Sequence, residues 1–209
     1  MKKQPKFIVF EGIDGAGKST QIRLLGDALA EKGFDVALTA EPTAYESGLH
    51  IRKILSGQIK TESKTLAELF ALDRANHNTN PDGGISSLMN SEKTVISDRY
   101  YYSSMAYQGS QIGLDTVISL NLDNPSIRRP DLCIFLDLDP QTSLSRIGKR
   151  NEATEIFENI EYLTKTRQMF FDVIDAMRER GDKIVCVDAS RSVEEISKDV
   201  LDAALSLWN

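Results

Sequence analysis

The sequence predicts an α/β protein of the P-loop type, in which helices cover both faces of a five-stranded parallel sheet. Five short apolar runs alternate along the chain with longer segments of helical periodicity, and parallel strands need such crossover segments between them. A glycine-rich phosphate-binding pattern stands directly after the first run and opens the first helical segment. Together, the alternation and the placed motif predict a three-layer nucleotide-binding fold.

The predicted strands are short and mostly rich in valine, isoleucine and phenylalanine, which is typical of strands buried on both faces. They cover residues 7–10, 35–40, 94–97, 132–138 and 183–187. The second run is less apolar than the others but follows a helix stop at Gly33. Ligands of parallel sheets bind beyond the carboxyl ends of the strands, so the charged residues there are the first candidates for a site.

Amphipathic periodicity predicts four main helical segments, at residues 19–32, 64–89, 155–180 and 193–207. Asn-Pro-Asp-Gly-Gly at residues 80–84 must break the second segment or form a loop within it. On the third, Arg167 stands where the apolar seam calls for a hydrophobic residue, and we expect it either to face the nucleotide cleft or to pair with a buried carboxylate such as Asp137 or Asp139. No repeat or linker interrupts the pattern, which predicts one domain over residues 1–209.

The composition excludes several classes of protein. Charged residues make up 27% of the 209 and the hydrophobic set 41%, which argues against a disordered chain, and no apolar stretch approaches the length of a membrane span. The net charge of −6 argues against a partner that is a nucleic-acid polymer. The apolar run near the start ends at Glu11, too early for a signal peptide, so we expect a cytoplasmic protein without a membrane partner.

The phosphate-binding pattern is Gly12-Ile13-Asp14-Gly15-Ala16-Gly17-Lys18-Ser19, followed by Thr20. Glycines let backbone N–H groups turn inward around a phosphate, and the helix N-terminus that follows favours negative charge. Lys18 is placed to reach the β- and γ-phosphates of a nucleotide, and the Ser19 hydroxyl to ligate Mg²⁺. We therefore expect these residues to bind a nucleoside triphosphate. The sequence lacks the guanine-binding pattern N-K-x-D, which disfavours a GTPase.

A second group of residues suits a phosphorylated acceptor. Arg52 and Arg99 follow adjacent predicted strands, where two guanidinium groups can clamp a monophosphate. Phe70 and Arg74 lie one helical turn apart and offer a ring that stacks on a nucleobase and a donor for its edge. Each feature taken alone also fits a structural role, as a surface ion pair or as a core phenylalanine beside an arginine that reaches water.

The combination resembles the thymidylate (dTMP) kinase family over nearly the whole chain. The matching stretches are Phe7-Ile8-Val9-Phe10-Glu11 with the phosphate-binding loop, Glu41-Pro42, Leu69-Phe70-Ala71-Leu72-Asp73-Arg74, Asp98-Arg99-Tyr100, Ala106-Tyr107-Gln108-Gly109, and Arg129-Pro130-Asp131-Leu132. The resemblance implies a sheet order of 2-3-1-4-5 and a cytoplasmic homodimer. It also implies transfer of the γ-phosphoryl group of ATP to dTMP, with Mg²⁺, to give dTDP and ADP.

The resemblance further implies roles for single residues. Asp98 would stand close to the metal, directly or through water, and Glu41 is a second candidate metal ligand. The implied acceptor site consists of Asp14 at the deoxyribose 3′-hydroxyl, Phe70 stacked on thymine, Arg74 at its edge, Arg52 and Arg99 at the phosphate, Ser103 nearby, Tyr107 at the place of a ribose 2′-hydroxyl, and Gln108 near the base or sugar.

Two departures from the family pattern bear on catalysis. Some relatives carry an arginine inside the phosphate-binding loop, where this chain has Ala16, so the positive charge is expected from a lid at about residues 142–156. Arg150 is the first candidate and Arg146 the second, although this basic run also fits a solvated turn. The family often has Arg-Glu-Pro-Gly-Gly-Thr, and Ala40 and Thr43 depart from it here, which affects the role of Glu41.

Two other functions remain open at this point. One is a P-loop kinase for a deoxynucleoside or for a different monophosphate. The other is a nucleotide-dependent switch that has no acceptor, which would leave Phe70, Arg74 and Arg99 without a function.

Overall fold

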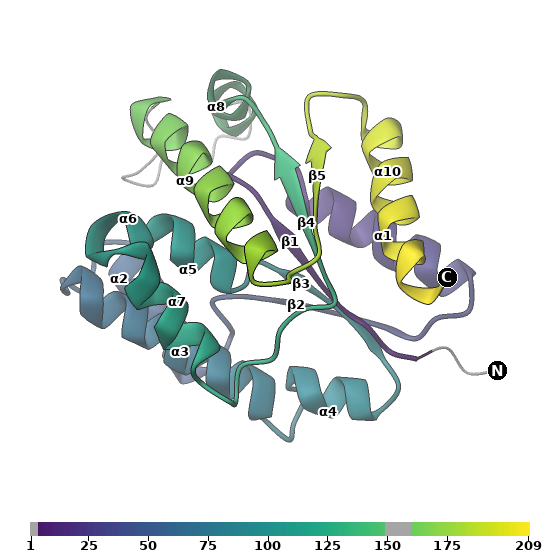
Figure 1. Ribbon diagram of the computed structural model, residues 1–209, viewed down its shortest axis with the longest axis horizontal. Coiled ribbons are helices and arrows are strands. Elements are labelled where there is room, and N and C mark those ends of the chain that lie inside the picture. Colours follow the sequence, from purple (N-terminus) through teal and green to yellow (C-terminus); the bar gives the residue numbers. More distant parts are fainter. Residues whose placement is uncertain (1–3, 149–159) are drawn as a thin grey trace.

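A parallel sheet forms the centre of the computed structural model, which describes residues 4–148 and 160–209 (Figure 1). Its strands stand in the order β2-β3-β1-β4-β5, and each pair of neighbours is parallel. The predicted class and the predicted order are therefore confirmed. The strands are β1 (Phe7–Glu11), β2 (Val36–Ala40), β3 (Thr94–Asp98), β4 (Leu132–Asp137) and β5 (Ile184–Asp188).

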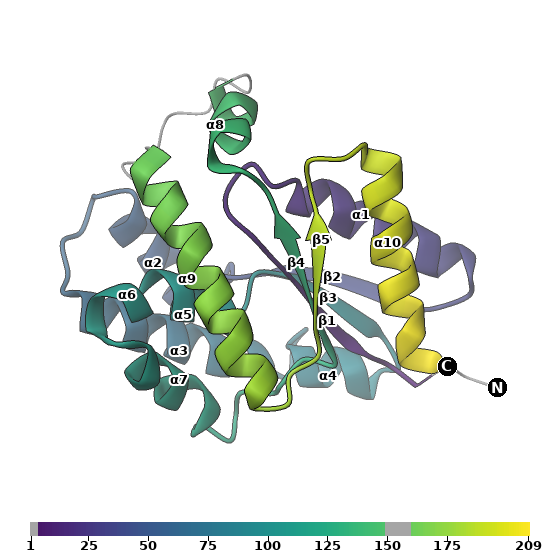
Figure 2. The same ribbon diagram turned by 45° about the horizontal axis from the view of Figure 1, so that its top comes forward.

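Helices cover both faces of the sheet, as expected for strands joined by crossovers (Figure 1). One face carries α1 (Lys18–Glu31) and α10 (Val193–Leu205), which is followed by a short 3₁₀ turn (Ser206–Trp208). The other face carries the largest group: α2 (Glu46–Leu55), α3 (Ser63–Thr79), α4 (Ile85–Asn90), α5 (Tyr101–Tyr107), α6 (Gly109–Ile112), α7 (Leu114–Leu122) and α9 (Ile160–Glu179). The remaining helix, α8 (Pro140–Gly148), lies beyond the carboxyl end of β4 (Figure 2).

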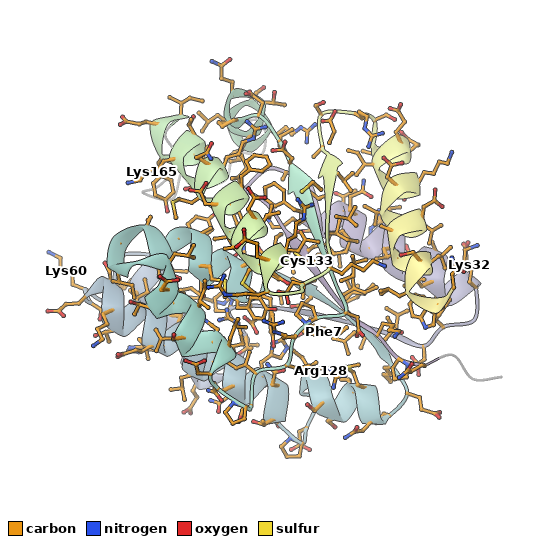
Figure 3. The ribbon with its side chains drawn as sticks, viewed as in Figure 1. Phe7, Lys32, Lys60, Arg128, Cys133 and Lys165 are labelled. Atoms are coloured by element: carbon orange, nitrogen blue, oxygen red, sulfur yellow. The ribbon has the colours of Figure 1, made fainter. Side chains whose placement is uncertain are left out.

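Two buried clusters join the layers. Ile22, Leu25 and Leu29 of α1 pack with one face of the sheet, and Phe170 and Val173 of α9 pack with the other. Figure 3 shows apolar side chains inside the molecule and charged ones at its surface: the labelled Phe7 and Cys133 lie in the middle, and the labelled Lys32, Lys60 and Lys165 lie at the rim. Burial of the central strands on both faces explains why they read as continuous apolar runs.

The helices agree with the periodicity where one face of the helix is exposed. The segment predicted at 64–89 is broken at the Asn-Pro-Asp-Gly-Gly sequence, because α3 ends at Thr79 and α4 begins at Ile85. The segment predicted at 155–180 is described from Ile160 onwards, and residues 155–159 lie outside the described residues. Helix α5 was not predicted, because its residues are buried nearly all round and leave no polar stripe in the sequence.

Among residues 4–148 and 160–209, no helix is long and apolar enough to cross a membrane.

Candidate active site

The phosphate-binding loop connects β1 to α1, as the motif requires. Gly12 has a φ of +143°, and a Cβ atom there would stand 2.6 Å from the carbonyl oxygen of Leu136 in the neighbouring strand, so a larger residue is excluded. Gly17 forms the N-cap of α1 with a φ of +95°. The first N–H groups of a helix have no partner within it, and they face this loop. The geometry suits a phosphate group.

Lys18 is a buried cation at the start of α1. Its Nζ donates to the carbonyl oxygens of Gly12 at 3.0 Å and Ile13 at 3.2 Å, and lies 3.9 Å from the carboxylate of Asp14. Burial, together with the nearby charge of Arg99, lowers the pKa of Lys18 to about 8, although the carboxylates around it oppose that shift. The ammonium group is therefore poised to gain stability from an incoming phosphate.

The lowered pKa makes nucleotide binding depend on pH. Only the protonated Lys18 attracts phosphate, so affinity is full below pH 8 and weakens as the free protein loses this proton above it. We expect the dissociation constant of ADP to rise about tenfold between pH 7 and pH 9, with uptake of a proton on binding. Calorimetric titration in buffers of different ionisation enthalpy measures both quantities.

The matched control for this effect is Lys18→Met, which removes the titrating group and keeps the length of the side chain. In that variant the dissociation constant should be raised and should vary little between pH 7 and pH 9. A wild-type affinity that stays constant over the same interval would contradict the assignment of the proton to Lys18.

A hydroxyl and a carboxylate meet beside Lys18. Ser19 Oγ lies 3.4 Å from Asp98 Oδ2, and Asp98 Oδ1 is buried without a hydrogen-bond partner among the described residues. Described residues contain no cluster of three or more histidine, cysteine or acidic side chains that could hold a metal by itself. An oxygen pair of this kind fits Mg²⁺, which is commonly held by one or two protein ligands together with the phosphates of its substrate.

A pocket of about 290 Å³ opens next to this loop. All eight side chains expected at the acceptor lie in its wall, although they come from the phosphate-binding loop, α2, α3, the turn after β3, and α5 with its C-terminal residue. Those residues are Asp14, Arg52, Phe70, Arg74, Arg99, Ser103, Tyr107 and Gln108. Glu41 lines it too, as do Pro42, Leu55, Leu66, Tyr100, Ser104, Gln111, Tyr162 and Leu163.

Arg99 connects the pocket with the phosphate-binding loop. Its Nη1 donates to the carbonyl oxygen of Gly12 at 3.3 Å, the same atom that accepts from Lys18, and to Ser103 Oγ at 2.9 Å. Its Nη2 donates to the carboxylate of Asp14, and this cation lowers the pKa of Asp14. Arg99 has a φ of +67°, an unusual conformation for a residue other than glycine and one that is concentrated at functional sites.

Two polar atoms in the wall of the pocket are without partners. The hydroxyl group of Tyr107 and Oε1 of Gln108 are both buried and form no hydrogen bond with the described residues. Burying such groups unpaired costs free energy, roughly 1–3 kcal/mol each. Their position indicates a ligand that supplies hydrogen bonds at this place.

Arg74 and Glu41 form a buried ion pair in the wall of the pocket. Arg74 is 1% exposed, and its Nε donates to Glu41 Oε2 at 2.7 Å. The other oxygen of Glu41 lies 2.9 Å from His77 Nδ1. Both carboxylate oxygens of Glu41 are engaged in this way, so the side chain anchors Arg74. Its expected role as a metal ligand stays a prediction.

Of the two arginines expected at the lid, one lies within the described residues and the other does not. Arg150 and the segment 149–156 of the expected lid lie outside the described residues. Arg146 of α8 donates to the carbonyl oxygen of Ala189, which follows β5. Arg167 forms a two-point bond with Asp137, at 2.6 and 2.9 Å, so the second of its two expected roles is confirmed.

Sequence reasoning missed Glu11 as a residue of the site. This fully buried carboxylate accepts from the backbone N–H of Tyr100 at 2.8 Å and from the Ser103 hydroxyl at 2.6 Å. Burial raises the pKa of Glu11, and the charge of Arg99 opposes that effect. Glu11 thereby holds the turn that carries Arg99. The signal in the sequence was a charged residue directly at the end of a buried strand.

Lys18 of the phosphate-binding loop and Arg99 of the acceptor pocket both donate to the carbonyl oxygen of Gly12. A nucleotide-binding loop joined in this way to a second pocket is typical of a P-loop phosphotransferase, in which a phosphate donor and an acceptor meet. Comparison with known proteins agrees. A profile of the thymidylate kinase family matches residues 10–200. The chain therefore belongs to the thymidylate kinase family.

Relatives of the chain span most of its length. A protein named thymidylate kinase from Leptospira interrogans (serovar copenhageni) is 39% identical over 87% of this chain and 88% of its own. A probable thymidylate kinase from Thermococcus onnurineus is 42% identical over 93% and 95%, and one from Methanobrevibacter smithii is 40% identical over 94% and 93%. The predicted family and the predicted activity, phosphorylation of dTMP by ATP, are confirmed.

Proposed function

We propose that the γ-phosphoryl group of ATP is transferred where Lys18 and Arg99 converge on the carbonyl oxygen of Gly12. This shared contact is the observation that carries the proposal, because it joins the nucleotide-binding loop to the acceptor pocket. An oxygen of the acceptor monophosphate attacks the γ-phosphorus, the bond to the β,γ-bridging oxygen breaks, and ADP leaves. The protein supplies positioning and positive charge, which are the main requirements of phosphoryl transfer.

The acceptor pocket supports the proposed binding of dTMP. Phe70 is partly exposed in the wall of the pocket, as a stacking ring must be, and Arg74 lies one helical turn further along α3. In this proposal Arg52 and Arg99 bind the monophosphate, and Ser103 orients Arg99. The remaining contacts proposed are those of Asp14 with the 3′-hydroxyl, of Tyr107 with the sugar, and of Gln108 with the base or sugar.

The proposal includes Mg²⁺ and a lid. Ser19 and Asp98 would hold the ion, which when bound neutralises charge on the triphosphate. A lid at about residues 142–156 of a single domain would exclude water, with Arg150 or Arg146 near the transferred group. Helix α8 supports this, since a Cβ atom on Gly15 would stand 3.0 Å from the carbonyl oxygen of Ser143, which places α8 against the phosphate-binding loop.

A panel of acceptors tests the proposed function. Nucleosides and monophosphates are each assayed for ADP formation with Mg-ATP, and we expect dTMP to give the highest kcat/KM. A nucleoside as the preferred acceptor would contradict the proposal, since it would leave the clamp of Arg52 and Arg99 without a phosphate. ATP hydrolysis that is indifferent to every acceptor would instead favour a nucleotide-dependent switch.

Phe70→Ala is expected to weaken binding of the acceptor, dTMP, and not binding of the donor, ATP. Stacking of a base on an aromatic ring contributes about 1–3 kcal/mol, so the KM for dTMP should rise roughly 5- to 150-fold while the KM for ATP stays near that of the wild type. Steady-state kinetics with each substrate varied in turn measures both. Glu68→Ala, an exposed change on the same helix, should alter neither; equal increases in both KM values for Phe70→Ala would exclude a stacking role.

We also propose a cytoplasmic homodimer that associates through a face of α2 and α3. Leu49 and Leu72 are 50% and 53% exposed, and Leu49 lines a surface groove together with Asn76 and Thr79. Leu72 precedes Asn76 by one helical turn and so lies on the same side of α3. Exposed leucines gathered on one face are typical of an interface.

A charge on this face is expected to separate the subunits. Leu72→Glu places a carboxylate against its symmetry mate in a two-fold interface, which should shift the dimer to the monomer in analytical ultracentrifugation. Val193→Glu, a similar change on α10 where the side chain is 45% exposed, is the control and should leave the mass unchanged. A monomeric wild-type protein at micromolar concentration would contradict the proposal.

A further inference from the structure

A chain of hydrogen bonds runs from β2 to the acceptor pocket through the interior. Thr39 Oγ1 lies 2.7 Å from His77 Nε2, and His77 Nδ1 lies 2.9 Å from Glu41 Oε1. The second oxygen of Glu41 accepts from Arg74 Nε at 2.7 Å. His77 is 2% exposed and Glu41 6%. Thr39 and His77 do not belong to the described lining of the pocket, whereas Glu41 and Arg74 do.

The chemistry of the carboxylate fixes where the proton of His77 is. An ionised carboxylate only accepts hydrogen bonds, and Glu41 is held by the guanidinium of Arg74 in this state. The short contact with Glu41 therefore requires a hydrogen on Nδ1 of His77, whether the ring is neutral or charged. In the neutral ring, Nε2 then accepts a hydrogen bond from the hydroxyl group of Thr39.

This arrangement limits how Glu41 can bind Arg74. Carboxylates often bind arginine through both oxygens, and that would use a second N–H group of the guanidinium. Here the second oxygen of Glu41 is held by His77. With the carboxylate held in this orientation, Arg74 bonds to Glu41 through Nε, and its Nη atoms bond to Asn121 Oδ1 and Ser104 Oγ.

The remaining donors of Arg74 suit a ligand. A guanidinium group has five N–H donors, and the three hydrogen bonds with the described residues leave two, one on each Nη atom. Arg74 lies in the wall of the pocket, and its guanidinium stands over the ring of Tyr100 at 5.2 Å, which fixes its plane. Two donors on a guanidinium group held in a fixed plane suit recognition of carbonyl oxygens.

The geometry points to His77 as a positioning residue for recognition of the acceptor base, acting through Glu41 on Arg74. By occupying Oε1 of Glu41 it keeps the Nη donors of Arg74 available to the pocket, and Thr39 keeps the His77 ring in the required orientation. This inference rests on the proposed function, because it assumes that the base of the acceptor meets Arg74.

Two sets of variants test the inference by kinetics. His77→Phe keeps the ring and removes both hydrogen bonds; it should raise the KM for dTMP about tenfold, the effect of one lost buried hydrogen bond, and leave the KM for ATP unchanged. His77→Asn restores a donor close to the position of Nδ1 and should recover most of the loss. Thr39→Val should raise the KM for dTMP by a smaller factor, whereas Thr39→Ser keeps the hydroxyl group and should match the wild type.

A spectroscopic measurement on the free protein is independent of the acceptor. The chain has only two histidines, so His50→Gln assigns the ring signals in a long-range ¹H–¹⁵N spectrum. We expect a proton on Nδ1 of His77 in the wild type. His50→Gln, a change at an exposed position on α2, should leave all kinetic constants unchanged.

Several outcomes would overturn the inference. A His77 ring with its only proton on Nε2 would exclude the bond to Glu41. An active His77→Phe with a wild-type KM for dTMP would remove the positioning role, and if that variant does not fold, equal values for Thr39→Val and Thr39→Ser would do the same. A wild-type protein that does not phosphorylate dTMP would instead contradict the proposed function, and the ring spectrum would still decide on the bond between His77 and Glu41.

Discussion

Arg99→Ala should lower kcat/KM for dTMP by roughly 10²–10³, the loss that follows removal of one donor aimed at developing charge, about 3–4 kcal/mol. The three hydrogen bonds that Arg99 makes to Gly12, Ser103 and Asp14 leave two of its five donors for phosphate oxygens. The variant loses both the clamp on the acceptor and the positive charge between the two substrates. Steady-state and single-turnover kinetics distinguish weaker binding from slower transfer.

The variant also removes the cation that most favours the charged forms of Glu11 and Asp14. Glu11 has a pKa that burial raises and Arg99 holds down, so without Arg99 its charged form is less stable. We therefore expect a lower melting temperature as well, which must be measured beside the activity. Arg99→Lys keeps the charge but not the planar fork, and it should recover the stability more fully than the rate. Near-wild-type turnover in Arg99→Ala would contradict the proposed mechanism.

The sheet could be predicted from the sequence, but several helices could not. Strands β1, β3 and β4 are buried on both faces and therefore leave apolar runs between polar ends. Helix α5 is buried on nearly every side, and α6 is a single short turn, so neither leaves a periodic pattern. The order of the strands came from resemblance to a family, because apolar runs do not say which strand pairs with which.

The residues of the site likewise divide into those that the sequence predicts and those that it does not. Phosphate-binding residues are adjacent in the chain and form a motif. Four acceptor residues were found because they follow strands or share a helical face, namely Arg52, Arg99, Phe70 and Arg74, whereas the others came from resemblance to a family. Glu11 escaped because its partner, the backbone N–H of Tyr100, stands 89 positions away. His77 escaped because a lone histidine on a helix gives no sign of a carboxylate 36 positions earlier. Buried polar contacts between distant residues are set by packing, which a single sequence does not display.

Lys18→Ala should reduce kcat by roughly 10²–10³. The ammonium group of Lys18 attracts the transferred phosphoryl group most strongly in the transition state, where the negative charge is spread over the phosphoryl oxygens. In the free protein Nζ already has two carbonyl partners, Gly12 and Ile13, on the loop that precedes it. These bonds hold the lysine in place before ATP arrives, so little reorganisation is needed at the reaction. Burial favours loss of its proton, and the phosphates of ATP reverse that tendency on binding.

The comparison with Lys18→Met separates charge from packing. Methionine fills most of the space of the lysine stem, so the two variants should lose activity alike if charge is decisive, while only the alanine variant leaves a cavity and lowers the melting temperature further. Lys32→Met, beyond the far end of α1, controls for loss of one positive charge and should keep wild-type kinetics. If Lys18→Met retained most of the wild-type kcat, the ammonium group would not stabilise the transferred phosphate. Transfer would then depend on Arg99 and the metal, and the loop would serve to bind ATP alone.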